Sequence, residues 1–135
     1  FLRDGTNRRT DAYGGNIGNR GRFLKEVTEA ILKVVEPGRV GVRLSPENTF
    51  NDIRDSEPQA TFEAVAEMLS FYRLAYLHVV EGDFVSGEKN IDYSRIKERF
   101  RGPYMANAGY TKDRAEQSLR RGETDLVSFG ALYIA

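Results

Sequence analysis

Four short apolar segments alternate along this sequence with four stretches whose apolar residues recur at helical spacing. The apolar segments, which we interpret as β-strands, cover residues 39–45, 75–80, 103–107 and 125–130. Because parallel strands need a crossover connection and an α-helix supplies it, this alternation indicates an α/β fold with parallel strands. The spacing of the segments is close to the roughly 31 residues per unit of a (β/α)8 barrel, although a doubly wound open sheet would fit nearly as well.

The helical stretches carry start and stop signals. Residues 56–59, Ser-Glu-Pro-Gln, predict a capping box with proline at an early helical position. Asp92 and Thr111 are predicted to cap the third and fourth helices. The first helix is expected within residues 19–36 and to bury one apolar stripe. That stripe comprises Phe23, Leu24, Val27, Ile31, Val34 and Val35.

The chain divides into a loop and one folded unit. Residues 1–18 contain four glycines and little periodicity, so we expect a long loop that follows a missing strand. Residues 19–135 then form half of a barrel. The sequence has no initiator Met and stops within an apolar run, so we expect a fragment of a longer chain. Four strands cannot close a barrel, so we expect pairing with a missing amino-terminal half-barrel, or self-association through exposed strand edges.

Composition limits the class of partner. The 135 residues carry 20 basic and 20 acidic side chains, a formal net charge of zero that argues against nucleic-acid and membrane-surface partners. There is no cysteine and no apolar run of membrane-spanning length, so we expect a cytoplasmic protein. The first 25 residues are locally basic, and we interpret them as a solvated or self-paired segment rather than a phosphate-binding arm.

Ligands of parallel α/β proteins gather at the carboxyl ends of the strands, and two loops there are rich in small residues. Such loops let backbone N–H groups approach a phosphate, and ordinary turns are the alternative interpretation. The first loop contains Asn107, Ala108 and Gly109, and the second contains Gly130 and Ala131.

Arg43 interrupts an apolar strand near its carboxyl end. Alternation places Val42 and Leu44 on the helix-facing side and Arg43 on the opposite, inward face. Since a guanidinium is costly to bury without a partner, Arg43 either forms an internal ion pair or binds an anionic ligand. The single histidine, His78, lies among apolar residues and is predicted to be structural. With no second histidine, a metal site is not expected.

Several motifs together resemble one family. The stretches "FLRDGTNRRTDAYGGNIGNRGRF", "RVGVRLSPENTFND", "YLHVVEG", "ANAGYT" and "DLVSFGALYIA" resemble the carboxyl-terminal half of the Old Yellow Enzyme family. The members of that family are FMN-dependent ene-reductases on a (β/α)8 barrel. The resemblance spans nearly the whole chain in the family's order, and it implies that the four strands are the fifth to eighth of the barrel.

The resemblance also implies residue roles. Arg43 matches the arginine beside the flavin N1 and C2 carbonyl, and Phe50 matches an aromatic residue near the substrate pocket. Ala131 departs from a frequent family pattern, in which an arginine reaches the phosphate. The residues that match the backbone cradle of the FMN phosphate are Asn107, Ala108, Gly109 and Gly130.

The family's carbonyl-binding pair and proton-donating tyrosine have no match in this chain. The full-length parent is implied to pass hydride from NAD(P)H through FMN to the activated C=C bond of an α,β-unsaturated carbonyl compound. The isolated chain is therefore expected to be inactive or nearly so. The alternative is a non-catalytic half-barrel that binds FMN weakly or self-associates. An aldolase-type barrel lacks support, because no lysine lies in an expected strand.

Overall fold

Helices and strands alternate through the computed structural model, which describes residues 1–83, 85–130 and 134. Two short 3₁₀ turns, Pro37–Arg39 and Phe50–Asp52, flank the first strand. The helices and strands, in chain order, are α1 (Ile17–Ile31), β1 (Gly41–Leu44), α2 (Pro58–Ser70), β2 (Tyr76–Val80), α3 (Tyr93–Phe100), β3 (Tyr104–Asn107), α4 (Lys112–Arg120) and β4 (Leu126–Val127).

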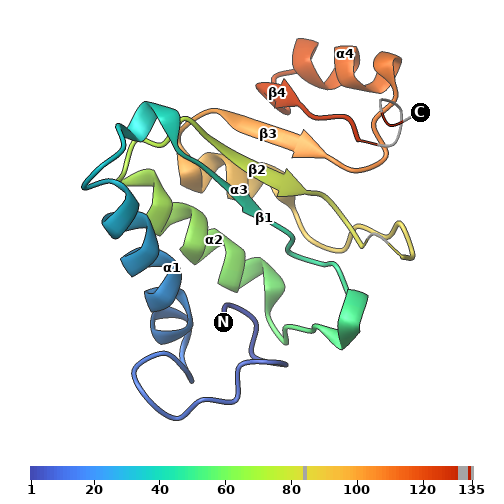
Figure 1. The fold of residues 1–135 in the computed structure, drawn as a ribbon. Coiled ribbons are helices and arrows are strands. Elements are labelled where there is room, and N and C mark those ends of the chain that lie inside the picture. The colour runs from blue at the N-terminus through green and yellow to red at the C-terminus, as the bar shows by residue number, and fades with distance from the viewer. Residues whose placement is uncertain (84, 131–133, 135) are drawn as a thin grey trace.

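The four strands form one parallel sheet in the order β1-β2-β3-β4, as the alternation predicted. Figure 1 shows α2 and α3 side by side against one face of this sheet, with α1 next to α2. The register sets Arg43 opposite His78 and Val80 opposite Asn107. Polar residues from three strands therefore lie near the same edge of the sheet.

The core lies between the sheet and the helices. Alternation along each strand sends one set of side chains toward α2 and α3, as expected for Leu44. Burying an aliphatic or aromatic side chain contributes about 1.5–3 kcal/mol, so this layer supplies most of the stabilisation. Its members include Leu44, Leu77, Val79, Tyr104 and Ala106 from the strands and Phe62, Val65, Leu69, Ile96 and Phe100 from the helices.

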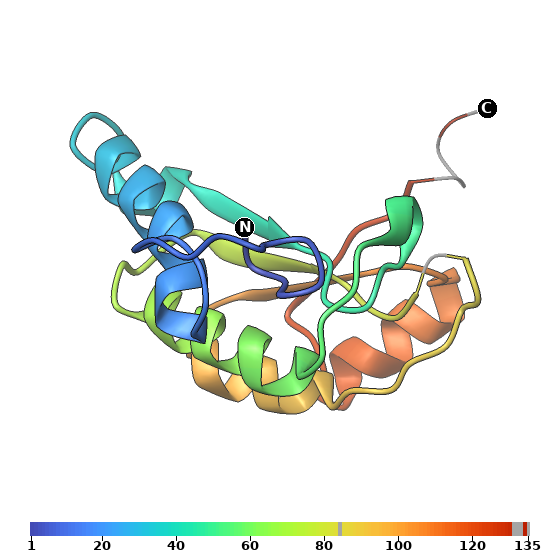
Figure 2. The same ribbon diagram turned by 90° about the horizontal axis from the view of Figure 1, so that it is seen from below.

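The opposite face of the sheet is less covered. Arg43 is exposed there, and His78 and Met105 are half-buried. Gly41 is needed on this face because the Tyr76 ring crosses it: a Cβ at Gly41 would lie 2.4 Å from the ring. The view in Figure 2, from below, shows α2, α3 and α4 on one side of the sheet.

Only part of the apolar stripe predicted for α1 is buried: Leu24 packs against the core, but other members stay exposed. Phe23, Val27 and Ile31 are all 39% exposed or more. The helix instead buries Arg20 and Thr28. Helical periodicity identifies an apolar face but not the neighbour that covers it, and within the described residues α1 packs on α2.

The prediction that the basic amino-terminal segment is solvated or self-paired is wrong for two of its arginines. Arg20 is buried, and its guanidinium donates to the carbonyls of Leu2 and Gly15, at 2.6 Å each, and to Thr61 Oγ1 at 3.0 Å. Arg3 is also buried and donates to the carbonyl oxygens of Ser45 and Ile53. Backbone carbonyls satisfy these buried cations, and the segment is thereby attached to α2 and to the loop after β1.

Two of the three capping predictions are confirmed and one is wrong. Asp92 accepts from the Ser94 N–H at 3.0 Å and Thr111 from the Arg114 N–H at 3.3 Å, so both predicted N-caps are confirmed. The capping box at residues 56–59 is wrong, because α2 is preceded by Glu57 without a side-chain cap bond. The Ser56 hydroxyl instead donates a hydrogen bond to Asp4, a contact that the local sequence does not reveal.

None of the described helices combines the length and the apolar character that crossing a membrane requires.

Candidate functional site

A cavity of about 620 Å³ lies where β1, β2 and β3 end, within the size range of small-molecule sites. The sequence predicted ligand binding at this edge because parallel strands carry their ligands at their carboxyl ends. The cavity brings together most of the predicted site residues with others that were not predicted. Its lining includes Arg43, His78, Asn107, Gly109, Ser128 and Gly130.

Arg43 has no acidic partner in the described part of the chain. Its Nη2 donates to Asn107 Oδ1 at 3.4 Å, and no carboxylate among the described residues lies within 4.0 Å. The Asn107 Nδ2 donates to the Ser128 carbonyl at 3.0 Å, which orients its oxygen toward the guanidinium. Of the two alternatives left open by the sequence, the internal ion pair is therefore not formed by the described residues. The positive charge is available to the cavity.

His78 lies beside Arg43 on the same face of the sheet. Its Nε2 is 2.8 Å from Ser128 Oγ, so the histidine has the internal partner that a structural role requires. Burial lowers the pKa of His78, and the neighbouring Arg43 charge lowers it further, so the imidazole is held neutral. Sequence alone missed that His78 also lines the cavity. Strand alternation was the available signal, but only the register pairs His78 with Arg43.

The loop after β3 exposes backbone donors. Ala108 and Gly109 both adopt left-handed conformations, with φ of 85° and 65°. In the part of the chain that the structure describes, neither backbone N–H donates a hydrogen bond. Successive free N–H groups before a helix, here α4, attract anions. The loop is therefore chemically suited to a phosphate or carboxylate group.

The remaining predicted residues lie at the margins of this cavity. Gly130 lines it from the segment after β4. Phe50 is 62% exposed and lies in an adjacent hollow of about 380 Å³. Arg43 and Asn48 border both spaces. Ala131 lies outside the described residues.

A parallel α/β sheet with crossover helices, and with a cation and free N–H donors at its carboxyl edge, is typical of the barrel and doubly wound classes of α/β protein. The comparison with known sequences resolves the class. The chain belongs to the NADH:flavin oxidoreductase / NADH oxidase family, whose sequence pattern matches residues 1–135. The predicted family is thereby confirmed, and the members of this family are oxidoreductases that use FMN.

Individual relatives of the chain support the same family. The chain is 40% identical over 152 aligned positions to 12-oxophytodienoate reductase 7 of Oryza sativa subsp. japonica, covering all of this chain and 39% of that protein. It is 37% identical to a probable flavin mononucleotide-dependent alkene reductase of Leishmania infantum, covering all of this chain and 37% of the relative. The chain thus spans under two-fifths of the length of these curated relatives.

Solved structures support the same fold. The Old Yellow Enzyme from Trypanosoma cruzi superimposes with a TM-score of 0.94 at 31% identity, over 99% of this chain and 36% of that one. Morphinone reductase superimposes with a TM-score of 0.91 at 39% identity, over 99% of this chain and 37% of that one. The fold of this chain is therefore part of a (β/α)8 barrel, as predicted.

Proposed function

We propose that this chain forms the flavin-binding portion of an FMN-dependent NAD(P)H oxidoreductase that reduces the activated C=C bond of α,β-unsaturated carbonyl compounds. Membership of the family supports the cofactor. Relatives named as an alkene reductase and as 12-oxophytodienoate reductases support the reaction class. Morphinone reductase has been solved in complex with tetrahydroNAD, which supports a nicotinamide reductant.

The observation that carries this proposal is the pairing of an unneutralised cation with an anion-binding loop in one cavity. Arg43 lacks a carboxylate among the described residues, and the N–H groups of Ala108 and Gly109 lack acceptors there. FMN presents a phosphate at one end and an electron-rich ring edge at the other. The cavity presents both kinds of group that FMN needs, a cation for the ring edge and N–H donors for the phosphate.

We assign roles accordingly. FMN, when bound, supplies hydride transfer. Arg43 is the residue at the flavin N1 and C2 edge, where its fixed charge stabilises negative charge on the ring. The backbone of residues 107–109 and Gly130 holds the phosphate. Phe50, in the hollow on the other side of Arg43, borders the substrate.

The test is a titration of the purified chain with FMN, followed by flavin fluorescence. Wild-type chain should bind FMN. Arg43→Met should weaken binding at least tenfold, since a hydrogen bond to a charged group contributes about 1.5–3 kcal/mol. Arg43→Lys should retain more affinity because it keeps the charge. Equal affinity of Arg43→Met and wild type would refute the assigned role of Arg43.

The matched control for Arg43 is Arg39→Met. Arg39 is exposed in the turn before β1, at the opposite end of the strand, so its removal changes net charge equally without touching the cavity. Its FMN affinity should match that of wild type. In an NADPH-dependent assay with 2-cyclohexenone, the chain should show little or no turnover. Substantial reduction by the pure 135-residue chain would contradict that expectation.

A second candidate is a non-catalytic half-barrel that self-associates. Within the described sheet, β1 and β4 each pair on one side only, so each leaves an edge open to another strand. The apolar side chains of α1 that remain exposed add surface for such contact. Size-exclusion chromatography with the absorbance spectrum distinguishes the two. A monomer with stoichiometric flavin counts against assembly, whereas a flavin-free oligomer counts against the first proposal.

A further inference from the structure

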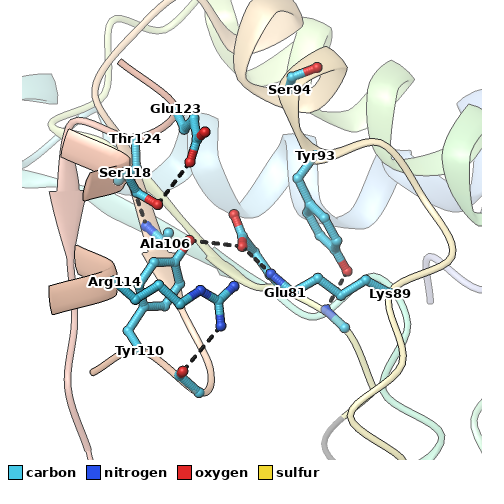
Figure 3. Close-up of polar contacts among 12 residues, drawn as sticks. Glu81, Lys89, Tyr93, Ser94, Ala106, Tyr110, Arg114, Ser118, Glu123 and Thr124 are labelled. Carbon is cyan, nitrogen blue, oxygen red and sulfur yellow. Dashed lines mark hydrogen bonds and ion pairs between the residues drawn. The ribbon is translucent and has the colours of Figure 1, made fainter. Parts of the chain in front are cut away.

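One buried carboxylate outside the cavity joins three separate segments of the chain. Glu81 directly follows β2, and its side chain is 9% exposed. Its Oε1 accepts a hydrogen bond from the Tyr104 hydroxyl at 3.1 Å. Its Oε2 accepts from the Tyr110 hydroxyl at 3.0 Å and from Lys89 Nζ at 2.6 Å. Figure 3 shows Glu81 between Tyr110 on one side and Lys89 on the other.

These bonds tie the loop after β3 to the sheet. Tyr110 immediately follows the anion-binding loop, whereas Tyr104 begins β3 and Lys89 lies in the connection between β2 and α3. Lys89 neutralises the carboxylate, and its Nζ also lies 5.8 Å from the centroid of the Tyr110 ring. Glu81 does not line the cavity, whereas Tyr110 does, so the Glu81 side chain can act on a ligand through Tyr110.

Tyr110 is held at two points. Its hydroxyl is bound by Glu81, and the Arg114 guanidinium lies over its ring at 4.3 Å from the centroid. Arg114 also donates to the Gly109 carbonyl at 3.1 Å, so the same side chain holds the loop itself. Burial, and then the Glu81 charge, raise the pKa of Tyr110 to about 12, which keeps its hydroxyl protonated as a donor.

The loop needs such support. Ala108 has φ of 85°, a conformation that non-glycine residues adopt only when their surroundings impose it. Gly109 follows with a second left-handed conformation. If the anchor at Tyr110 is removed, the loop can relax, and the two free N–H groups can leave their present positions.

We propose that Glu81 is a positioning residue for the phosphate group of FMN: through Tyr110 it holds the N–H groups of Ala108 and Gly109 in the conformation that binds the phosphate. This inference rests on the proposed function. It predicts that loss of the Glu81–Tyr110 contact weakens the binding of FMN but not of riboflavin, because riboflavin has the same ring as FMN but no phosphate.

The experiment measures the dissociation constants of FMN and riboflavin by fluorescence for wild type, Glu81→Gln, Tyr110→Phe and Tyr104→Phe. Glu81→Gln and Tyr110→Phe should weaken FMN about tenfold, the value of one hydrogen bond, and leave riboflavin within about twofold. Tyr104→Phe removes another hydroxyl that donates to Glu81, but Tyr104 lies in β3 and not in the loop. This variant should therefore not change the ratio of the FMN and riboflavin dissociation constants. Glu88→Gln, an exposed charge removal in the β2–α3 connection, should resemble wild type.

Two results would overturn the inference. An equal loss of both flavins in Tyr110→Phe would mean that the contact only stabilises the fold. An unchanged ratio in both Glu81→Gln and Tyr110→Phe would mean that the contact does not act on the phosphate. Tyr110→Phe keeps the test valid if Glu81→Gln does not fold.

Inorganic phosphate provides a readout that does not depend on flavin binding. In NMR titrations, phosphate should shift the amide signal of Gly109 in wild type and shift it less in Tyr110→Phe. If phosphate shifts this signal less in Tyr110→Phe than in wild type but neither flavin binds, the proposed function fails, and only the link between Tyr110 and phosphate binding by the loop stands. If phosphate leaves the signal of the wild-type chain unmoved, the inference fails.

Discussion

Replacement of Arg20 by methionine should destabilise the fold severely although it changes no core hydrophobic residue. The Arg20 side chain is 8% exposed and donates to two backbone carbonyls and to Thr61. It is also the cation closest to Asp55, at 4.0 Å, and the Asp55 side chain is 1% exposed. One oxygen of that carboxylate, Oδ2, is buried without a hydrogen-bond partner. Methionine would fill most of the aliphatic volume but provide none of these contacts.

The loss in the free energy of unfolding can be estimated from the groups that lose their contact with Arg20. Each hydrogen bond lost costs about 1 kcal/mol, so the three bonds of Arg20 give about 3 kcal/mol. The loss of the cation beside a buried carboxylate raises the total toward about 5 kcal/mol, in line with broken buried ion pairs. A domain of this size is stable by about 5–15 kcal/mol, so Arg20→Met removes a large fraction of the total.

Urea denaturation followed by circular dichroism measures this loss. With an m-value of about 2 kcal/mol/M, a loss of about 4 kcal/mol lowers the midpoint by about 2 M. Arg22→Met is the matched control, because Arg22 is exposed and donates to the Ala12 carbonyl. Asp55→Asn in the Arg20→Met background should recover part of the loss by removing the uncompensated charge. If Arg20→Met costs under 1 kcal/mol, or no more than Arg22→Met, the reasoning is refuted.

Three further outcomes are expected. Ala108→Gly should raise the free energy of unfolding by about 1 kcal/mol, because glycine adopts a positive φ without strain; thermal unfolding measures it. Arg43→Met should raise the pKa of His78 toward its ordinary value while burial keeps it below, as read from the imidazole NMR signal of the single histidine. Tyr110, with its pKa raised to about 12, stabilises the fold fully below pH 10, and this contribution disappears between pH 10 and 12. Unfolding of wild type and Tyr110→Phe across that range should show the difference.

Each of these outcomes has a result that contradicts it. A destabilised Ala108→Gly would mean that the left-handed conformation carries no strain. An unchanged His78 pKa in Arg43→Met would mean that the guanidinium is screened from the imidazole. Arg43→Lys is the control there, since it retains the charge. If the free energy of unfolding falls equally in wild type and Tyr110→Phe between pH 10 and 12, the ionisation of Tyr110 does not contribute to the loss of stability.

The sequence predicted the secondary structure well where the signal is local. Strand alternation around Arg43 and Leu44 depends on neighbours two residues away, and caps at Asp92 and Thr111 depend on the next three residues. The capping box predicted at residues 56–59 is wrong because a local pattern cannot include a distant competing partner. Asp4, which takes the Ser56 hydroxyl, is 52 residues distant, and no local pattern reports it.

The candidate site was predictable in part. Small residues at strand ends indicated the loop at residues 107–109 and Gly130, and the motifs identified the family. His78 was assigned a structural role, and the structure adds that it borders the cavity. The contacts of Glu81 were missed, since a carboxylate after a strand is most often solvated. No sequence pattern joins Glu81 to a tyrosine 29 residues later.

The sequence by itself determined the order of elements, the parallel connections and the inward position of Arg43, because periods of two and 3.6 residues are properties of a single segment. Only the tertiary structure decided which groups surround each charge. It placed no carboxylate of the described chain beside Arg43, it buried Arg20 among carbonyls, and it joined Glu81 to Tyr110. The physical reason is that the energy of a buried charge depends on every group within a few ångströms. Which groups those are is set by strand register and helix packing, which combine residues far apart in the chain.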